Sequence, residues 1–137
     1  MKREAGYTLT EMLVVIGIIG LIAAVLTPTL MGQLGRARLK AAGLQLQTVS
    51  AQVEVFMADT GRYPTVQEGL RALVVEPEGA EGWAGPYVRD EKALTDPWGR
   101  ALRYAIDADN RYVVSTLGAD GKVGGSSVNR DLSVPAR

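Results

Sequence analysis

The chain has 137 residues, with 15 basic and 15 acidic side chains, and it contains neither cysteine nor histidine. The missing thiols exclude disulfides, thiolate metal sites and cysteine nucleophiles, and the missing imidazoles remove the commonest general base and the usual zinc ligands. The balanced charge lacks the excess of basic groups that marks a nucleic-acid partner, so we expect neither an enzyme nor a nucleic-acid-binding protein.

The first predicted element is an apolar helix near the N terminus. Every residue in 12–26 is apolar or glycine, and extension back to Tyr7 gives 20 residues with one charge, Glu11. About 20 apolar residues span a bilayer as a helix. The run ends without a small-x-small cleavage site and the next residues keep a helical pattern, so we expect a membrane-inserted helix rather than a removed signal peptide.

Charge is unevenly distributed around this helix. Residues 1–40 carry five basic and two acidic groups, a net charge of +3, and the remaining residues carry −3. The positive-inside rule places Lys2 and Arg3 in the cytoplasm, but Arg36, Arg38 and Lys40 on the other side favour the opposite orientation. Charge alone therefore orients the chain weakly.

Glu11 is the one ionisable group inside the apolar stretch. A carboxylate within a membrane costs several kcal/mol unless it is paired, which makes it a functional hypothesis; the alternative is an ionised group at the headgroup interface. No Lys or Arg lies between Arg3 and Arg36. Cleavage before Tyr7 would create an α-amine one helical turn from Glu11, or on a neighbouring subunit, that could pair with it.

The residues around Glu11 match a known leader. Lys2 to Gly6, followed by Tyr7-Thr8-Leu9-Thr10-Glu11 and the apolar run, resembles the leader of type IV pilins and pseudopilins. The resemblance implies that a prepilin peptidase cuts after Gly6, that the new N terminus at Tyr7 is methylated, and that Glu11 guides subunit docking. Tyr7 replaces the usual Phe but is also aromatic, and Pro28 stands where the family places a helix-perturbing proline.

After Pro28 the helix is predicted to continue as an amphipathic segment. Two adjacent apolar stripes with alternating spacings of three and four together make a wide apolar face. We expect the C-terminal half of this face to pack on the chain's own globular part. A helix from Tyr7 to Ala58 would be about 78 Å long, too long to be covered by the residues that follow, so the N-terminal half should meet lipid and then other subunits. The stripes are Leu34, Ala37, Ala41, Leu44, Thr48, Ala51, Val55 and Ala58, and Leu39, Ala42, Leu46, Val49, Val53 and Phe56; the polar face opposite includes Gln45.

Glycines interrupt the helix at Gly17, Gly20, Gly32 and Gly35. Each costs roughly 1 kcal/mol of helix stability relative to alanine. Small residues allow close approach of helices in membranes, while ordinary membrane-helix composition is the alternative explanation.

The remaining residues predict a small α+β part after a helix end near Asp59-Thr60-Gly61. A long helix followed by a small antiparallel sheet is an α+β layer. The predicted elements are a short helix Gln67–Val75, a loop Glu76–Gly85, a tight turn Asp96–Gly99, a hairpin of strands Ala101–Ile106 and Arg111–Thr116, and a loop Leu117–Asn129.

An ordered series of motifs extends the resemblance over the whole chain. Tyr63-Pro64-Thr65, Asp96-Pro97-Trp98-Gly99 and Gly118-Ala119-Asp120-Gly121 occur in the order seen in the major pseudopilins of type II secretion systems, the general secretion pathway protein G family. The resemblance implies a type IV pilin-like fold: a cleaved leader 1–6, a transmembrane and polymerisation helix 7–27, its amphipathic continuation 28–59 and a periplasmic part 60–137. It places the chain in the bacterial inner membrane as a single-pass protein.

The resemblance also implies a calcium ion in the loop after the hairpin, held by carboxylates and backbone carbonyls. Asp120 matches the first family ligand, but Ser126-Ser127-Val128-Asn129 stands in place of an adjacent acidic pair. The next acid is Asp131. The expected ligands are Asp120 and Asp131, joined by Ser127, Asn129 and the backbone carbonyls of Leu117 and Val123; the alternative is a loop held without metal.

The function implied is that of the major structural subunit of a pseudopilus, which polymerises through its N-terminal helix and drives export of folded proteins. Its implied partners are copies of itself, prepilin peptidase, minor pseudopilins, an inner-membrane assembly platform, an outer-membrane secretin and membrane lipid. The energy source lies elsewhere, because the chain has no phosphate-binding Gly-Lys-Ser/Thr loop. Alternatives are a type IV pilin or minor pilin for adhesion, motility or DNA uptake, against which the absent disulfide counts, and a membrane-tethered enzyme or binding module.

Overall fold

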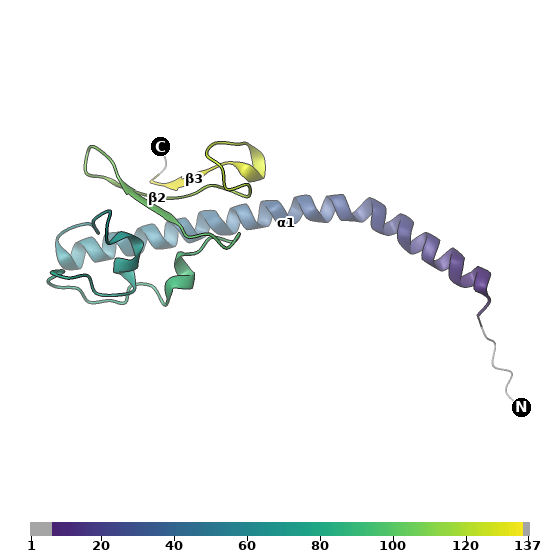
Figure 1. The fold of residues 1–137 in the computed structure, drawn as a ribbon, viewed down its shortest axis with the longest axis horizontal. Coiled ribbons are helices and arrows are strands. Elements are labelled where there is room, and N and C mark those ends of the chain that lie inside the picture. Colours follow the sequence, from purple (N-terminus) through teal and green to yellow (C-terminus); the bar gives the residue numbers. More distant parts are fainter. Residues whose placement is uncertain (1–6, 136–137) are drawn as a thin grey trace, which may run out of the picture. The chain divides into compact units, whose positions relative to one another are not determined.

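The computed structural model describes residues 7–135, and its internal contacts divide the chain into two units, Met1–Gly35 and Arg36–Arg137. One helix, α1 (Leu9–Thr60), belongs to both units (Figure 1). The prediction of a continuous helix that passes Pro28 is confirmed. The boundary between the units lies at Gly35, inside the segment predicted as the amphipathic continuation.

The C-terminal end of α1 is set by a glycine, as predicted. Gly61 has a φ of 73°, and its N–H donates to the carbonyl of Met57 at 2.9 Å. This left-handed conformation satisfies a terminal carbonyl and costs glycine little, because glycine has no Cβ. The Thr60 hydroxyl donates to the carbonyl of Phe56 at 2.8 Å and satisfies a second carbonyl of the last turn. The helix therefore stops where its local sequence directs.

One of the two predicted stripes of α1 is buried in the second unit, and the other is not. The stripe that starts at Leu34 is exposed along its whole length, with Leu44 59% exposed. The expectation that both stripes pack on the chain's own globular part is therefore wrong for this one. The residues after Thr60 cover one side of the helix, and two adjacent stripes can be buried only if a helix is surrounded more fully. The buried stripe consists of Leu39, Ala42, Leu46, Val49, Val53 and Phe56.

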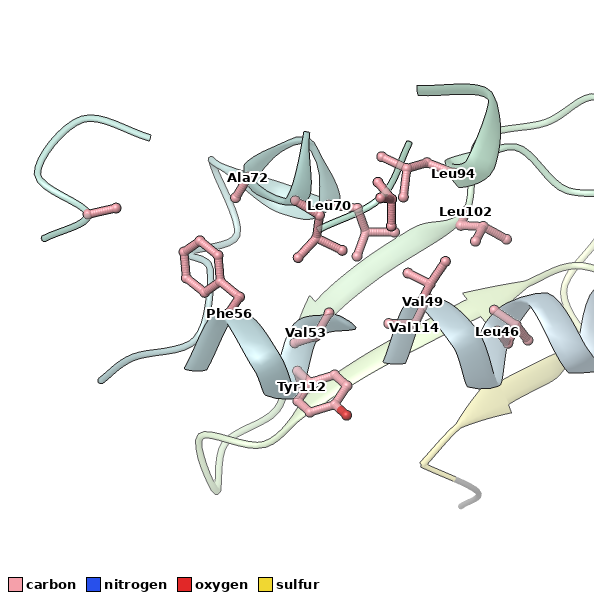
Figure 2. Close-up of a cluster of buried hydrophobic side chains, with 13 residues drawn as sticks. Leu46, Val49, Val53, Phe56, Leu70, Ala72, Leu94, Leu102, Tyr112 and Val114 are labelled. Atoms are coloured by element: carbon pink, nitrogen blue, oxygen red, sulfur yellow. The ribbon is translucent and has the colours of Figure 1, made fainter. Parts of the chain in front are cut away.

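Three antiparallel strands cover this stripe in the order β1-β2-β3. They are β1 (Arg103–Ile106), β2 (Tyr112–Thr116) and β3 (Leu132–Val134). The central strand β2 buries every second side chain, as a two-residue repeat requires, and Figure 2 shows its Tyr112 and Val114 in the same cluster as Val49 and Val53. The predicted hairpin is confirmed, with Tyr104 opposite Val114. The strand β3 was not predicted, because three residues are too short to show an alternating pattern.

Short 3-10 helices complete the second unit: η1 (Gly69–Leu73), η2 (Glu91–Leu94) and η3 (Ser127–Asn129). The helix predicted over 67–75 is thus shorter and tighter than expected. The predicted turn at Asp96 is confirmed, since the Gly99 N–H donates to the Asp96 carbonyl at 2.9 Å. Residues 76–85 form no helix or strand, also as predicted.

Two polar side chains of α1 hold the second unit together. The Gln45 amide nitrogen donates to the carbonyls of Ala93 and Thr95 at 2.8 and 2.7 Å. The hydroxyls of Ser50 and Tyr112 are hydrogen-bonded at 2.7 Å in the core. Gln45, predicted on the polar face opposite the apolar stripes, is half-buried, and the two N–H donors of its amide both bind carbonyls of the chain.

Candidate functional site

The N-terminal part of α1 presents a continuous apolar surface. Every residue from Tyr7 to Leu34 is exposed in the single chain, and Leu13 and Ile19 are 66% and 60% exposed. Among the described residues, α1 is the one helix long and apolar enough to cross a membrane. Soluble monomers rarely expose contiguous apolar patches above a few hundred Å². This surface therefore requires lipid or other protein chains as its environment.

Glu11 lies in a reciprocal cap at the start of α1. The backbone N–H and the hydroxyl of Thr8 both donate to Glu11 Oε2, at 2.7 and 2.8 Å, and the Glu11 N–H donates to Thr8 Oγ1 at 3.2 Å. This is a capping box, in which the N-cap residue and the third helical residue satisfy each other's N–H groups. This capping box was not predicted, although Thr8-Leu9-Thr10-Glu11 has the required pattern.

The cap uses one of the two carboxylate oxygens of Glu11. Oε2 accepts both bonds from Thr8, while Oε1 accepts none from residues 7–135. A carboxylate can accept about four hydrogen bonds, so Oε1 is available to a donor from outside this chain segment. Tyr7 is 82% exposed, and Gly6, the other half of the predicted cleavage site, lies outside the described residues. The pairing of Glu11 with an α-amine stays a prediction.

Pro28 and the glycines mark places where another helix could approach. Proline lacks an N–H, so the carbonyl four residues earlier loses its helical donor, yet α1 continues through Pro28. The neighbouring Thr27 hydroxyl donates to the Ala23 carbonyl at 2.7 Å. Beyond its chain neighbours and the surrounding helix backbone, a Cβ added at Gly17, Gly20 or Gly32 would meet no atom within 4 Å. These small positions are unused within the chain and open to a partner helix.

The loop between β2 and β3 holds the residues predicted as calcium ligands. Asp120 Oδ1 accepts the N–H of Lys122 at 3.1 Å, and Asp131 Oδ2 accepts the N–H of Gly124 at 2.8 Å. The Ala119 N–H donates to the Val128 carbonyl at 3.0 Å and folds the loop back on itself. Each carboxylate thus closes a turn of its own backbone.

A cation of the chain already enters this loop. The Arg100 guanidinium donates to the Gly118 carbonyl, and a Cβ added at Gly121 would collide with it. The same guanidinium pairs with Asp96 at 3.3 Å and stacks on Trp98, 5.6 Å from its ring centre. This role of Arg100 was not predicted, because Arg100 and Gly118 are 18 residues apart in the sequence.

Asp96 anchors Arg100 from the core side. It is 5% exposed and accepts hydrogen bonds from the Thr116 hydroxyl at 2.6 Å and from the N–H groups of Arg100 and Trp98 at 2.9 and 3.0 Å. Burial on its own raises the pKa of Asp96, but the hydrogen bonds from Thr116, Arg100 and Trp98, with the nearby Arg100 charge, bring the pKa below its ordinary value. Asp96 therefore stays ionised as the counter-charge of Arg100.

These contacts do not fit a calcium site. Calcium takes six to eight oxygens, and the described residues contain no group of three or more acidic side chains that could hold a metal ion. Asp120 and Asp131 serve backbone N–H groups, Ser127 and Asn129 add no charge, and a guanidinium stands beside Gly121. The geometry favours the alternative raised from the sequence, a loop held without metal.

Comparisons with known families cover nearly the whole chain. Residues 29–134 match the profile described as type II secretion system protein G, and residues 1–27 match the prokaryotic N-terminal methylation motif. The second match contains the predicted cleavage site after Gly6, Glu11 and most of the apolar surface described above.

Individual relatives agree with the profiles. The chain is 35% identical to the type II secretion system core protein G of Xanthomonas campestris, over 94% of this chain and 88% of that one. It is 33% identical to the core protein G of Pseudomonas aeruginosa, over 96% and 94% of the two chains. The crystal structure of the major pseudopilin from the type 2 secretion system of enterohaemorrhagic Escherichia coli matches with a TM-score of 0.59 and 26% identity, over 78% of this chain and 94% of that one.

Proposed function

Because the chain belongs to the type II secretion system protein G family, we propose that its exposed apolar helix first anchors it in the inner membrane and then packs against copies of itself in a filament. The chain has the role of a major pseudopilin in type II secretion. The matches favour secretion over the type IV pilin alternative.

The observation that carries the proposal is the exposure of residues 7–34. No side chain in this range is buried within the chain, and the stripe of α1 that starts at Leu34 is also exposed as far as Ala58. Lipid covers this apolar surface before assembly, and neighbouring helices cover it afterwards. Assembly therefore replaces lipid contacts with helix–helix packing. The bare faces of Gly17, Gly20 and Gly32 let those helices approach closely.

Glu11 supplies the polar contact that selects a register in this exchange. Processing after Gly6 would leave an α-amine at Tyr7, and the unused Oε1 of Glu11 is an acceptor for the amine of a neighbouring subunit. An unpaired charge is costly in the membrane, which favours the one helix register that pairs it. The Thr8 cap presents the carboxylate in a fixed conformation for that contact.

The remaining parts of the proposal concern placement and partners. The apolar helix crosses the inner membrane once, with residues 36–137 in the periplasm. Prepilin peptidase processes the chain, and an assembly platform, minor pseudopilins and an outer-membrane secretin act with the filament to export folded proteins. The subunit works as a structural element rather than as a catalyst.

The proposal is tested in a strain that lacks this protein, complemented with the wild-type chain, Glu11→Gln or the control Glu54→Gln. We expect wild type and Glu54→Gln to restore filaments and secretion, because Glu54 lies on α1 outside the apolar segment. Glu11→Gln should enter the membrane at normal levels but reduce filaments and secreted protein at least tenfold. Normal filaments from Glu11→Gln would contradict the register role of this carboxylate.

Processing is tested on the same samples. Intact mass of the membrane-extracted protein should correspond to residues 7–137 plus one methyl group. Gly6→Ala should retain the full mass of the unprocessed chain, and loss of residues 1–6 in that variant would contradict cleavage after Gly6.

A further inference from the structure

A groove with a basic rim lies on the second unit where α1 meets the loop before β3. It has a volume of about 500 Å³, and Arg36, Lys40 and Arg130 line it together with Leu39 and Leu44. All three basic side chains are exposed, and none forms an ion pair with any residue in the range 7–135. Arg36 and Lys40 are four residues apart on the helix, a spacing at which like charges repel. The three cations of this basic groove therefore have no ion-pair partner among residues 7–135.

An acidic loop of the same unit has the complementary composition. Glu76, Glu78 and Glu81 are exposed, and none of them is in an ion pair within the part of the chain that the structure describes. Arg71, which lines one pocket with Glu76 and Glu78, pairs instead with Glu91 at 3.4 Å. The loop also presents an exposed apolar side chain, since Val75 at its start is 49% exposed. Residues 75–81 thus offer three exposed carboxylates and the exposed apolar side chain of Val75.

The acidic loop and the segment before β3 that borders the basic groove lie toward opposite ends of the second unit (Figure 1). The loop is fixed to the C-terminal end of α1, because the Tyr87 hydroxyl donates to Asp59 at 2.9 Å and the backbone at Gly82 lies against the Asp59 carbonyl. The groove is formed around Lys40, 19 residues earlier on the helix. At 1.5 Å per residue the two surfaces are about 28 Å apart along α1. They therefore cannot meet within one chain.

We propose that the basic groove of one subunit receives the acidic loop of another subunit further along the filament. Contact between two different surfaces of identical chains is heterologous, and in parallel copies it generates an open polymer rather than a closed dimer. Three cations meet three carboxylates, and Val75 meets the apolar floor at Leu44. The inference rests on the proposed function, since it assumes that parallel copies form a filament.

Cross-linking tests this contact with all six charges in place. The chain has no cysteine, so Gln47→Cys in the groove and Val75→Cys at the loop create the two thiols of a clean disulfide pair. Oxidised filaments of the double variant should give a ladder of dimers, trimers and longer species. The control pair Lys122→Cys with Val75→Cys should give no ladder. Wild-type filaments together with no ladder from the test pair, or dimers from Gln47→Cys alone, would overturn the contact.

Charge reversal gives an independent measurement. Arg130→Glu and Glu78→Arg should each reduce filaments per cell several-fold, and the chain with both changes should recover to within about twofold of wild type, because opposite charges again face each other. Tryptophan fluorescence of Trp83 and Trp98 checks that each variant is folded. Folded single variants with undiminished filaments, or a double variant no better than the singles, would overturn the proposal.

The results of these experiments distinguish three cases: failure of the proposed function, failure of the subunit contact alone, and binding of lipid headgroups in the groove. Failure of the wild-type chain to form filaments would overturn the proposed function and the contact with it. Wild-type filaments without cross-links or charge rescue would overturn the contact alone. Sheared filaments are also mixed with phosphatidylglycerol vesicles; binding that Arg130→Glu abolishes, without charge rescue by Glu78→Arg, would assign the groove to anionic headgroups instead.

Discussion

The two units of this chain differ in how their apolar helix surface is removed from water. In residues 36–135 the apolar stripe of α1 is buried by the chain itself, with Leu46, Val53 and Phe56 fully covered. In residues 7–35 the helix is more apolar, yet none of its side chains is buried. One helix thus carries a segment that is stable as part of a folded unit and a segment that needs other molecules. The difference separates folding from assembly along a single helix.

The largest expected effect is on the free energy of unfolding of the second unit, which should respond to mutation in that unit but not in the first. Phe56→Ala should lower the free energy of unfolding of the second unit by about 3–5 kcal/mol, because it removes a fully buried ring and leaves a cavity. Ile19→Ala should change it by less than about 0.5 kcal/mol, because Ile19 is exposed in the single chain. The measurement is denaturant unfolding of the full chain in detergent micelles, followed by Trp83 and Trp98, which both lie in the second unit.

Filament yield, unlike the free energy of unfolding, should be sensitive to Ile19→Ala. That variant removes an assembly contact and should reduce filaments while the folded unit stays intact. An Ile19→Ala chain with wild-type filaments and a destabilised second unit would contradict the division of the two roles.

A smaller effect is the loss of stability at low pH, which should be confined to the second unit. Arg62 donates to both carboxylate oxygens of Glu68 at 2.7 and 2.8 Å, and the Thr65 N–H donates to the same group at 2.7 Å. The Arg62 hydrogen bonds lower the pKa of Glu68 from 4.5 to about 2, against the opposing effect of burial. Since the folded-state pKa is below the unfolded one, this stabilisation is complete above about pH 4.5 and is lost as the pH falls toward 2.

The Glu68 contribution should be about 1–2 kcal/mol, less than the full pKa shift would convert to, because solvent screens the partly exposed Arg62. Glu68→Gln should therefore be destabilised at pH 7 and should lose less stability than wild type between pH 5 and pH 3. The matched control Glu76→Gln, at an exposed loop position, should follow the wild-type pH profile. Parallel pH profiles of Glu68→Gln and wild type would contradict the assignment.

The smallest expected effect tests whether the second unit needs a metal. Chelation by EDTA should leave its unfolding midpoint unchanged, because the Arg100 guanidinium supplies the positive charge beside the Gly118 carbonyl. Arg100→Gln should lower the free energy of unfolding by about 1 kcal/mol through the lost bonds to Gly118 and Asp96. A midpoint that falls with EDTA, recovers with calcium and loses this response in Asp120→Ala would restore the predicted calcium site.

Local signals in the sequence were sufficient for most of the second unit. The end of α1 at Gly61 and the turn at Asp96 follow from residues within a few positions of each other, and both predictions are confirmed. The hairpin of β1 and β2 follows from two alternating runs joined by a turn-forming segment. The capping box at Thr8 and Glu11 was equally local, and its pattern was available but overlooked.

The sequence by itself determined the long helix, its apolar N-terminal half and the α+β class, because helical periodicity and hydropathy are properties of contiguous residues. Tertiary structure alone decided which stripe of α1 is buried, that Gln45 binds the chain at Ala93 and Thr95, and that Leu132–Val134 pairs as a third strand. It also brought Arg100 to Gly118. Each of these contacts joins residues 16 or more positions apart, where spacing along the chain carries no information on distance in space.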